Sequence, residues 1–397
     1  MEENISVTVA QNCILDSVVE CTSKIIPLNQ ASGKILAEDI IAQIDYPPFD
    51  QSAMDGYAVR FSGSRKDDFF KLNGVVSAGD AKKVNMEKGH AVRIFTGAKI
   101  PAGSDAVVIQ EEARENDLKV FVTIHPEQGA HIRRKGEVIR SGKIAIKKGA
   151  LLHAGAIGYL ASLGVNKVRV IQNPQVMLIA TGSEIQMPGR ILKKGNIYES
   201  NSACLASALM ELGICAKKTI VIPDDKKKLL RKTQDALNDC DILITTGGIG
   251  GGDFDFLRTI FNESGVKGIF YRVRQKPGKP FYFGKKKNTL VFGLPGNPVS
   301  SLTCFYEYVY PAIKRMQGHT RHFLKKGFLA LGTNQIKKKN LSLFLRGKAY
   351  SDYVIPCPGQ KSHDMKSFAE ANCLVYLPEG DEEIKANSVV EVHYLPG

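Results

Sequence analysis

The stretch DILITTGGIGGGDFD, residues 241–255, decides the fold class of this chain of 397 residues. Its beginning, residues 241–244, is apolar and predicts a buried strand. The glycines that follow are too flexible to form a rigid packing element, and they let backbone N–H groups approach an anion closely. A helical pattern comes next, and a helix N-terminus favours negative charge. We interpret the segment as an anion-binding loop of an α/β domain, with a flexible turn as the alternative.

Predicted strands and helices alternate around this loop from residue 172 to residue 322. The segments VMLIATG, residues 176–182, and TLVFGLPG, residues 289–296, are further apolar strands. Such alternation predicts a mostly parallel sheet that is covered by helices on both faces. Ligands bind beyond the carboxyl ends of the strands in sheets of this kind. The main helices are expected at residues 201–212, 225–238 and 298–317.

The rest of the chain has other patterns. Short β-like runs alternate with Gly and Pro turns in residues 45–138, which predicts a small β-rich domain. Residues 139–171 return to a helical pattern, and we expect them to pack with the helix of residues 1–44, so that the β-rich domain is an insertion. Residues 323–397 contain short β-like runs and predict a small all-β domain.

Composition narrows the class of protein. Hydrophobic residues make up 43% and charged residues 24% of the chain, as in soluble globular proteins. No apolar run approaches the roughly 20 residues of a membrane helix, and the start lacks the order of a signal peptide. We therefore expect a cytoplasmic protein without membrane association. The net charge of +14 suits anionic ligands, but the lysine runs lack the interleaved aromatics of a nucleic-acid surface.

Two loops at the expected carboxyl edge are rich in glycine and proline. One is the glycine loop, and the other is GLPGNPVSSL, residues 293–302. In the second loop Asn297 can cap the long helix, and Pro298 suits its first turn. The surrounding glycines and prolines indicate a fixed turn that faces a ligand, although an ordinary capped helix start has the same residues. The candidate binding residues of the two loops are Gly247, Gly248, Gly250, Pro295, Asn297 and Pro298.

Cations and carboxylates accompany these loops. Lys276 and Lys279 flank the Pro-Gly turn of QKPGKPF, so both can point one way as anion ligands; a solvated turn is the alternative. Mg²⁺ prefers a few carboxylates together with substrate phosphate. Hydrolase motifs such as G-x-S-x-G and H-E-x-x-H are missing from the sequence. The carboxylates that could hold Mg²⁺ are Glu184, Asp241, Asp253 and Asp255.

The β-rich region contains the most specific motif of the chain, PPFDQSAMDGYAVR, residues 47–60. RIFTGAKIPAGSDAVV, ATGSEI, TTGGIGGGDFD, KPGKPF and GLPGNPVSSL follow it in that order. Together these segments resemble the MoeA family, the molybdopterin molybdenumtransferases, which include the C-terminal part of gephyrin. The resemblance covers nearly the whole chain, with a weaker match at residues 359–372, GQKSHDMKSFAEAN.

The resemblance implies a fold of four parts. Residues 1–44 and 139–171 would form an elongated helical N-terminal domain, and residues 45–138 an inserted β-rich domain. Residues 172–322 would form an α/β molybdopterin-binding domain like that of the MoaB and MogA proteins, and residues 323–397 a small C-terminal β-barrel. The resemblance also implies a homodimer with the active site shared between subunits, and the molybdopterin adenylyltransferase as an expected partner.

The resemblance further implies a reaction. Adenylylated molybdopterin and molybdate would combine with the help of Mg²⁺, so that AMP is released and molybdenum enters the dithiolene. By matching position, Glu184, Asp241 and Asp255 would be the set that holds the metal and orients water. A non-catalytic cofactor-binding or scaffold protein on the same fold is the alternative. Val138, which stands where the family usually has an acidic residue, is the departure that supports this alternative.

Other residues are assigned from the same resemblance. Lys276 and Lys279 would hold phosphate or molybdate, because a tetrahedral dianion needs cations and backbone donors. Ser362 would belong to the same binding site. Asp55 and Thr96 lie in the β-rich domain and would close the site from the partner subunit.

Overall fold

The computed structural model divides the chain into two compact units. Unit 1 combines Met1–Lys24 with Val170–Gly397, and unit 2 is Ile25–Arg169. Among the described residues, no helix is both long and apolar enough to span a membrane. The residues that the structure describes are 1–60, 69–80, 84, 86–249 and 256–396.

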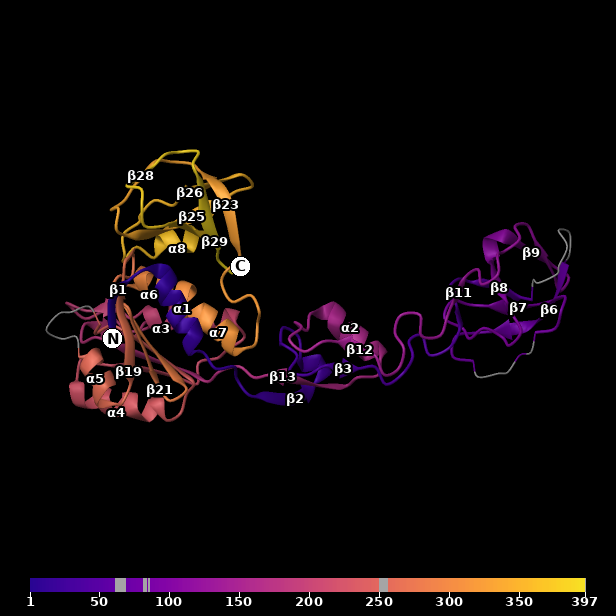
Figure 1. The fold of residues 1–397 in the computed structure, drawn as a ribbon, viewed down its shortest axis with the longest axis horizontal. Helices are drawn as coiled ribbons and strands as arrows, with labels where there is room; N and C mark the ends of the chain where they lie inside the picture. The colour runs from indigo at the N-terminus through magenta and orange to yellow at the C-terminus, as the bar shows by residue number, and fades with distance from the viewer. Residues whose placement is uncertain (61–68, 81–83, 85, 250–255, 397) are drawn as a thin grey trace. The chain divides into compact units, whose positions relative to one another are not determined.

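Unit 1 is built on a mixed sheet whose central strands are parallel (Figure 1). Its strand order in the described part of the chain is β1-β19-β21-β22-β18-β14-β17. Strands β17, β14, β18 and β22 run parallel, whereas β21 is antiparallel to both of its neighbours. The predicted mostly parallel sheet is thus confirmed, with additional strands at one side. The bounds are β1 Glu2–Ile5, β14 Val176–Thr181, β17 Lys218–Ile222, β18 Ile242–Thr246, β19 Lys267–Val273, β21 Tyr282–Lys286 and β22 Thr289–Leu294.

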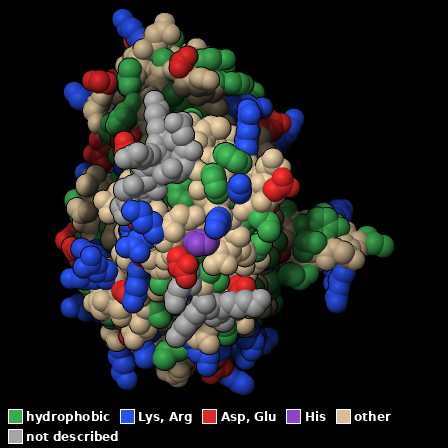
Figure 2. Space-filling view, turned by 90° about the vertical axis from the view of Figure 1, so that its right-hand side faces the viewer, with side chains coloured by type: hydrophobic (Ala, Val, Ile, Leu, Met, Phe, Trp, Pro, Cys, Tyr) green, Lys and Arg blue, Asp and Glu red, His purple; other side chains and the backbone are tan. Residues whose placement is uncertain are grey.

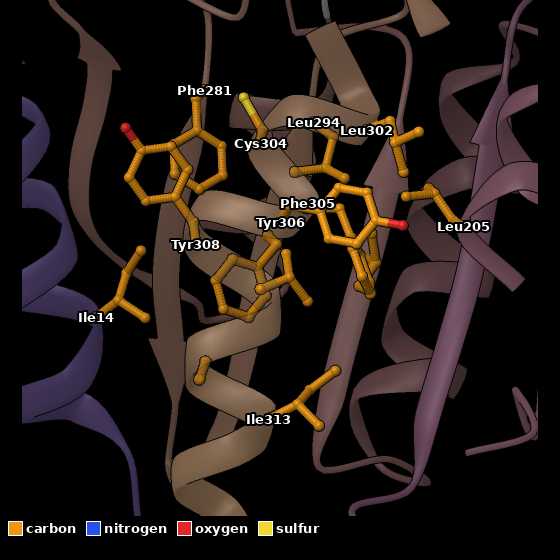
Figure 3. Packing of buried hydrophobic residues seen from close by; sticks show 14 of the residues in the cluster. Ile14, Leu205, Phe281, Leu294, Leu302, Cys304, Phe305, Tyr306, Tyr308 and Ile313 are labelled. Carbon is orange, nitrogen blue, oxygen red and sulfur yellow. The ribbon is translucent and has the colours of Figure 1, made fainter. Parts of the chain in front are cut away.

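Helices cover both faces of this sheet. One face carries α1, α3 and the long helix formed by α6, η3 and α7, and the other face carries α4 and α5. Figure 3 shows the first face, where Leu302 of the long helix lies beside Leu294 at the end of β22, and Ile313 lies farther along the helix. The η3 segment is a π-helical turn inside the predicted long helix. The bounds are α1 Val7–Ser17, α3 Asn201–Glu211, α4 Lys226–Leu237, α5 Leu257–Glu263, α6 Pro298–Cys304, η3 Phe305–Val309 and α7 Tyr310–Met316.

Helix α1 belongs to unit 1. The sequence predicts that it packs with residues 139–171, and the structure corrects this expectation. Its apolar stripe, Val7, Ala10 and Ile14, is buried in one core with Ile313 of α7. The stripe is thereby covered by the long helix and the neighbouring strand β19, so that residues 1–24 join the α/β part of the chain.

The C-terminal part of unit 1 is a closed β-barrel, as the family resemblance implies. Strand β25 pairs with β26 on one side and with β27 on the other, and β29 links β27 to β23. Because β23 also pairs with β26, the described strands form a ring. Leu331, Leu345 and Val375 are buried in its interior. The bounds are β23 Lys326–Leu331, β25 Ser342–Ala349, β26 Tyr353–Pro356, β27 Cys373–Leu377 and β29 Val389–Tyr394.

Unit 2 contains the predicted β-rich region. Its largest sheet has the order β8-β5-β7-β6-β10-β9 over the described residues. Val59 and Val108 are buried on one face of this sheet, and Val92 and Val107 on the other. The same unit contains α2, Ala154–Ser162. The sheet bounds are β5 Gly56–Val59, β6 Phe69–Val76, β7 His90–Ile94, β8 Ala106–Ile109, β9 Ala113–Asn116 and β10 Lys119–Val122.

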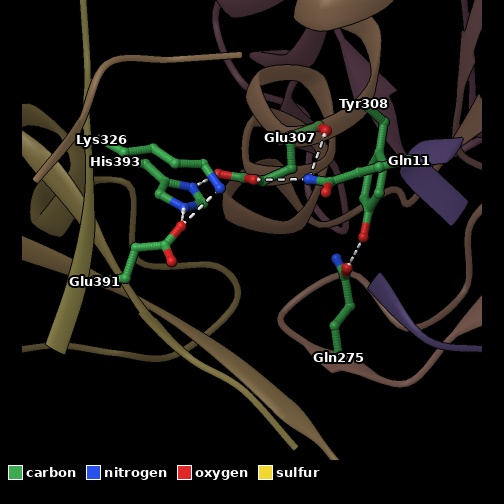
Figure 4. A network of polar contacts seen from close by, with 7 residues as sticks. All are labelled: Gln11, Gln275, Glu307, Tyr308, Lys326, Glu391 and His393. Atoms are coloured by element: carbon green, nitrogen blue, oxygen red, sulfur yellow. Dashed lines mark hydrogen bonds and ion pairs between the residues drawn. The ribbon is translucent and has the colours of Figure 1, made fainter. Parts of the chain in front are cut away.

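A buried charged network joins the barrel to the long helix (Figure 4). Nδ1 of His393 lies 2.7 Å from Oε1 of Glu307, and its Nε2 lies 2.8 Å from Oε1 of Glu391. Burial lowers the pKa of His393, but the charges and hydrogen bonds of Glu307 and Glu391 outweigh burial and raise this pKa to about 9. The imidazolium therefore compensates two carboxylates inside the interface between barrel and helix.

We expect this network to make the stability of the protein depend on pH. The folded-state pKa of His393 lies above the ordinary value of 6.5, so its contribution to stability is complete below pH 6.5 and is lost as the pH rises through about 9. His393→Gln should lower the melting temperature most at the acidic end of this window and flatten the profile across it. Loss of the charge leaves the buried carboxylate of Glu307 without a charged partner, at a cost of about 3–5 kcal/mol, whereas Glu391 keeps its ion pair with Lys326.

Calorimetric melting across this pH window would test the expectation. His363→Gln is the matched control, because His363 is exposed. Equal pH profiles for wild type and His393→Gln would contradict it.

Candidate functional site

The carboxyl ends of β14, β18 and β22 surround a cavity in unit 1. Its volume is about 560 Å³, and its wall combines the loops after these strands with the start of α3 and with His363. Parallel strands bring these loops to one edge of the sheet, where ligands of α/β domains bind. The size is in the usual range for small-molecule sites. The predicted residues in the wall are Glu184, Gly247, Gly248, Pro295, Asn297 and Pro298.

The glycine loop crosses the end of β14 at close range. Gly247 and Gly248 have φ angles of +89° and +58°, in the region that favours glycine. A Cβ atom on Gly247 would lie 2.2 Å from the carbonyl oxygen of Thr181. Glycine at this position is therefore required by both conformation and space. The predicted Gly250, Asp253 and Asp255 lie outside the described residues.

Asn201 ties three parts of the cavity wall together, although it was not predicted from the sequence. Its Nδ2 donates hydrogen bonds of 2.7 Å to Oγ1 of Thr246 and to the carbonyl oxygen of Gly296. Thr246 in turn donates to the carbonyl oxygen of Pro295, at 3.1 Å. Asn297 occupies the N-cap position of α6, but its side chain makes no capping hydrogen bond. The loop after β22 is thus fixed by Asn201 rather than by the predicted cap.

Asp224 is another acidic residue of this cavity, besides Glu184 and Glu199, and it too was not predicted. It follows β17, and its Oδ1 accepts a 2.7 Å hydrogen bond from Oγ1 of Thr181. Its Oδ2 accepts a 3.2 Å bond from the backbone N–H of Ser183. Glu184 directly follows Ser183 in the sequence and lines the same cavity. The position of Asp224 at a strand end was the available signal, since the same rule identified Glu184.

Asp241 lies at the amino end of β18, whereas the cavity lies at the carboxyl ends of the parallel strands. This position corrects its predicted role. Asp241 precedes β18, and its Oδ2 accepts a 2.7 Å hydrogen bond from the backbone N–H of Gln175, just before β14. The five-residue length of β18 separates it from the cavity by roughly 15 Å. The predicted set of Glu184, Asp241 and Asp255 therefore does not assemble in the described part of the chain. Within that part, no group of three or more His, Cys, Asp or Glu is placed to hold a metal ion.

The predicted lysines line a second cavity, of about 660 Å³. It adjoins the first one, because Pro280 and His363 belong to both walls. Lys276, Lys279 and Ser362 all lie in its wall. Both lysine side chains are exposed, whereas the Pro-Gly pair between them is buried. The turn therefore has a packed base and two cationic side chains that can reach a ligand.

Arg346 of β25 fixes the loop that carries Ser362. Its Nε donates to Oγ of Ser367 at 3.1 Å, and its Nη2 donates to the carbonyl oxygens of Gly359 and Lys361 at 3.1 and 3.3 Å. Burial lowers the pKa of Arg346 to about 10, so the guanidinium stays charged at neutral pH. An arginine inside an apolar strand pattern was the sequence signal for this role.

Asp55 and Thr96 meet within unit 2. Oδ1 of Asp55 accepts hydrogen bonds of 2.7 Å from both the backbone N–H and the hydroxyl of Thr96. These bonds lower the pKa of Asp55 and favour its charged form. Val138, the residue that departs from the expected pattern, is exposed in the same unit.

Basic residues are dispersed on the face that Figure 2 draws. On the face drawn in Figure 2, the described Lys and Arg side chains stand in small groups among acidic, apolar and neutral ones. A nucleic-acid interface usually gathers them on one face. The lysine turn is therefore a better candidate anion site than this surface.

Comparison with known proteins gives consistent matches along the chain. Family models for the MoeA N-terminal region (domain I and II), a probable molybdopterin binding domain and the MoeA C-terminal region (domain IV) match residues 5–164, 177–315 and 329–395. A molybdopterin molybdenumtransferase of Haemophilus influenzae is 35% identical over 372 residues, 92% of each chain. One of Staphylococcus epidermidis is 33% identical over 398 residues, 98% of this chain and 95% of the relative. A molybdopterin biosynthesis moeA protein of Pyrococcus horikoshii superimposes with a TM-score of 0.85 at 31% identity, covering 99% of this chain and all of the other.

The close crossing of the glycine loop leads to a prediction about stability. Gly247→Ala should be more destabilising than Gly213→Ala, because both positions have positive φ but only the former places Cβ against another atom. The conformational penalty alone is about 1 kcal/mol, and the collision with Thr181 adds to it. Urea unfolding of both variants would measure the difference. Equal decreases in the free energy of unfolding for the two variants would show that the loop can move away from β14.

Proposed function

Because the chain belongs to the MoeA family of molybdopterin molybdenumtransferases, we propose that it transfers molybdenum from molybdate into adenylylated molybdopterin and releases AMP. The observation that carries the proposal is the pair of adjoining cavities, one with the glycine loop and one with two exposed lysines. A nucleotide-linked pyrophosphate needs backbone donors, and a tetrahedral dianion needs cations. The non-catalytic scaffold is not favoured, since the curated relatives are named as transferases.

The residues of each cavity have distinct parts in this proposal. Backbone N–H groups at Gly247 and Gly248 bind phosphate oxygens, and the loop after β22 closes the wall beside them. Lys276 and Lys279, with Ser362, bind molybdate in the adjoining cavity. The shared wall places the oxyanion next to the adenylylated substrate, so that proximity supports the transfer.

Mg²⁺ is the metal that this site would use. Glu184 and Asp224 both line the first cavity, and two carboxylates together with substrate phosphate suit this ion. The ion would neutralise phosphate charge and activate water for release of AMP. Asp224 replaces Asp241 in this proposal because only Asp224 lies at the carboxyl edge.

We also propose a homodimer in which Asp55 and Thr96 of one subunit complete the cavity of the other. The support is family membership together with the preorganised hydrogen bonds of this pair. The cytoplasm as the compartment, and the molybdopterin adenylyltransferase as the enzyme that delivers the substrate, belong to the same proposal.

Release of AMP tests the reaction directly. Purified protein with adenylylated molybdopterin, molybdate and Mg²⁺ should release AMP, and a chelator should stop it. Asp224→Asn should lower kcat by about 10²–10³-fold, as for loss of an active-site electrostatic group. Asp241→Asn is the matched control and should keep turnover within about twofold of wild type, because it lies outside the site. Absence of metal-dependent AMP in the wild type would overturn the proposed function.

Subunit complementation tests the shared site. Asp55→Ala and Glu184→Ala should each be inactive alone, since they damage different halves of one cavity. After the two proteins exchange subunits, half of the dimers would be mixed and would have one intact site. About one quarter of the wild-type rate per subunit is then expected. A mixture that stays inactive, although mass spectrometry shows mixed dimers, would argue against a site shared between subunits.

A further inference from the structure

The lysine turn rests on a buried polar contact with the long helix. Tyr308, on the π-helical turn η3, has no exposed surface, and its hydroxyl donates a hydrogen bond to Oε1 of Gln275 (Figure 4). Gln275 is only 1% exposed, and its Nε2 donates a 2.9 Å bond to the carbonyl oxygen of Pro277. The hydroxyl of Tyr308 is thus linked through one amide to the backbone between Lys276 and Lys279.

Close packing reinforces this link. The ring of Tyr308 stacks on Phe281 with centroids 4.7 Å apart, at the far end of the same turn. Gly278 has a φ of +88°, and a Cβ atom there would lie 2.5 Å from Sγ of Cys304 and 2.9 Å from Nε2 of Gln275. The base of the turn therefore packs directly against the helix.

The barrel holds the other side of the turn. Gln275 and Lys276 form strand β20, which pairs in parallel with β25 at Ser342 and Leu343. The backbone N–H of Ser342 donates to the carbonyl oxygen of Arg274 at 2.9 Å. These bonds fix the backbone at the start of the turn but do not reach Pro277. The far end of the turn is held by the backbone N–H of Val273, which donates to the carbonyl oxygen of Lys279 at 3.0 Å. Between these two anchors, the amide of Gln275 holds Pro277.

We propose that Tyr308 and Gln275 are positioning residues that set where Lys276 and Lys279 present their ammonium groups to the oxyanion. The hydroxyl orients the amide, and the amide holds the turn that separates the two lysines. An unpaired amide in this buried place would be costly, so loss of the hydroxyl leads the amide and the turn to shift. The inference rests on the proposed function in so far as the oxyanion is molybdate.

Figure 4 shows two side chains of the π-helical turn η3 that reach different parts of unit 1. Two successive residues of this turn leave the helix in different directions, Glu307 toward His393 of the barrel and Tyr308 toward Gln275. π-Helical turns occur frequently at functional sites. The same turn therefore docks the barrel and supports the lysine segment.

Tyr308→Phe tests the proposal because it removes one oxygen and keeps the ring on Phe281. We expect the KM for molybdate to rise by about tenfold, the usual effect of one lost buried hydrogen bond. The value of kcat at saturating molybdate and the KM for adenylylated molybdopterin should stay within about twofold. A double-mutant cycle with Gln275→Leu should be non-additive, since both variants interrupt one link.

Tyr306→Phe is the matched control. Tyr306 lies on the same helical turn, is 6% exposed, and donates to Glu211 at 3.0 Å, away from the lysine turn. It should lower the melting temperature about as much as Tyr308→Phe does and leave the KM for molybdate unchanged. Equal molybdate KM values for the two variants would overturn the proposal. If Tyr308→Phe does not fold, Gln275→Met takes its place with the same expected result, because it removes the donor to Pro277 and the acceptor for Tyr308 without adding a charge.

Direct binding separates this proposal from the proposed function. Calorimetric titration with molybdate should show weaker binding to Tyr308→Phe than to wild type or Tyr306→Phe. Weaker binding without AMP release by any variant would support the positioning role and overturn the transferase. AMP release by all variants with unchanged molybdate affinity would support the transferase and overturn the positioning role. Wild-type protein that neither binds molybdate nor releases AMP would overturn both.

Discussion

The parallel direction of β14, β18 and β22 is the constraint on which the candidate site depends. Because these strands point the same way, their loops meet at one edge, although more than a hundred residues separate the first loop from the last. The approach of Gly247 to the carbonyl group of Thr181 is possible only with neighbouring parallel strands. Asp224 and Glu184 share a cavity for the same reason, and Asp241 is excluded from it.

The long helix connects the wall of the first cavity to the barrel. It starts at the loop after β22, in the wall of the first cavity, and it ends against α1. Between these ends, Glu307 meets His393 and Tyr308 meets Gln275. A single helix thus contacts the glycine-loop cavity, the lysine turn and the C-terminal domain. Its π-helical turn divides the last two contacts between adjacent residues.

Much of the fold and part of the site followed from sequence patterns. Periodicity identified the parallel sheet and a C-terminal all-β region, the family resemblance implied the barrel, and strand ends identified Glu184. Asp224 was not predicted as a site residue because an Asp-Asp pair before a helical pattern is typical of a helix start. Its neighbour Asp225 does cap α4, since it accepts a 3.0 Å hydrogen bond from the backbone N–H of Lys228. Asp241 was misplaced because an acidic residue beside an apolar strand does not by itself reveal which end of the strand binds the ligand. The stripe of α1 likewise indicates burial but does not identify a partner.

The pairing of β1 with β19 has a consequence for synthesis of the chain. Ile5 lies beside Val273 in this parallel pair, so the first strand leaves the ribosome long before its partner exists. At about 5–20 residues per second, the wait is on the order of tens of seconds. Unit 2 lies between the two strands in the sequence and is translated completely during this time. The pairing of β1 with β19 and the docking of α1 can therefore occur only late in synthesis. These contacts join residues that are far apart in the sequence, so they raise the contact order of unit 1.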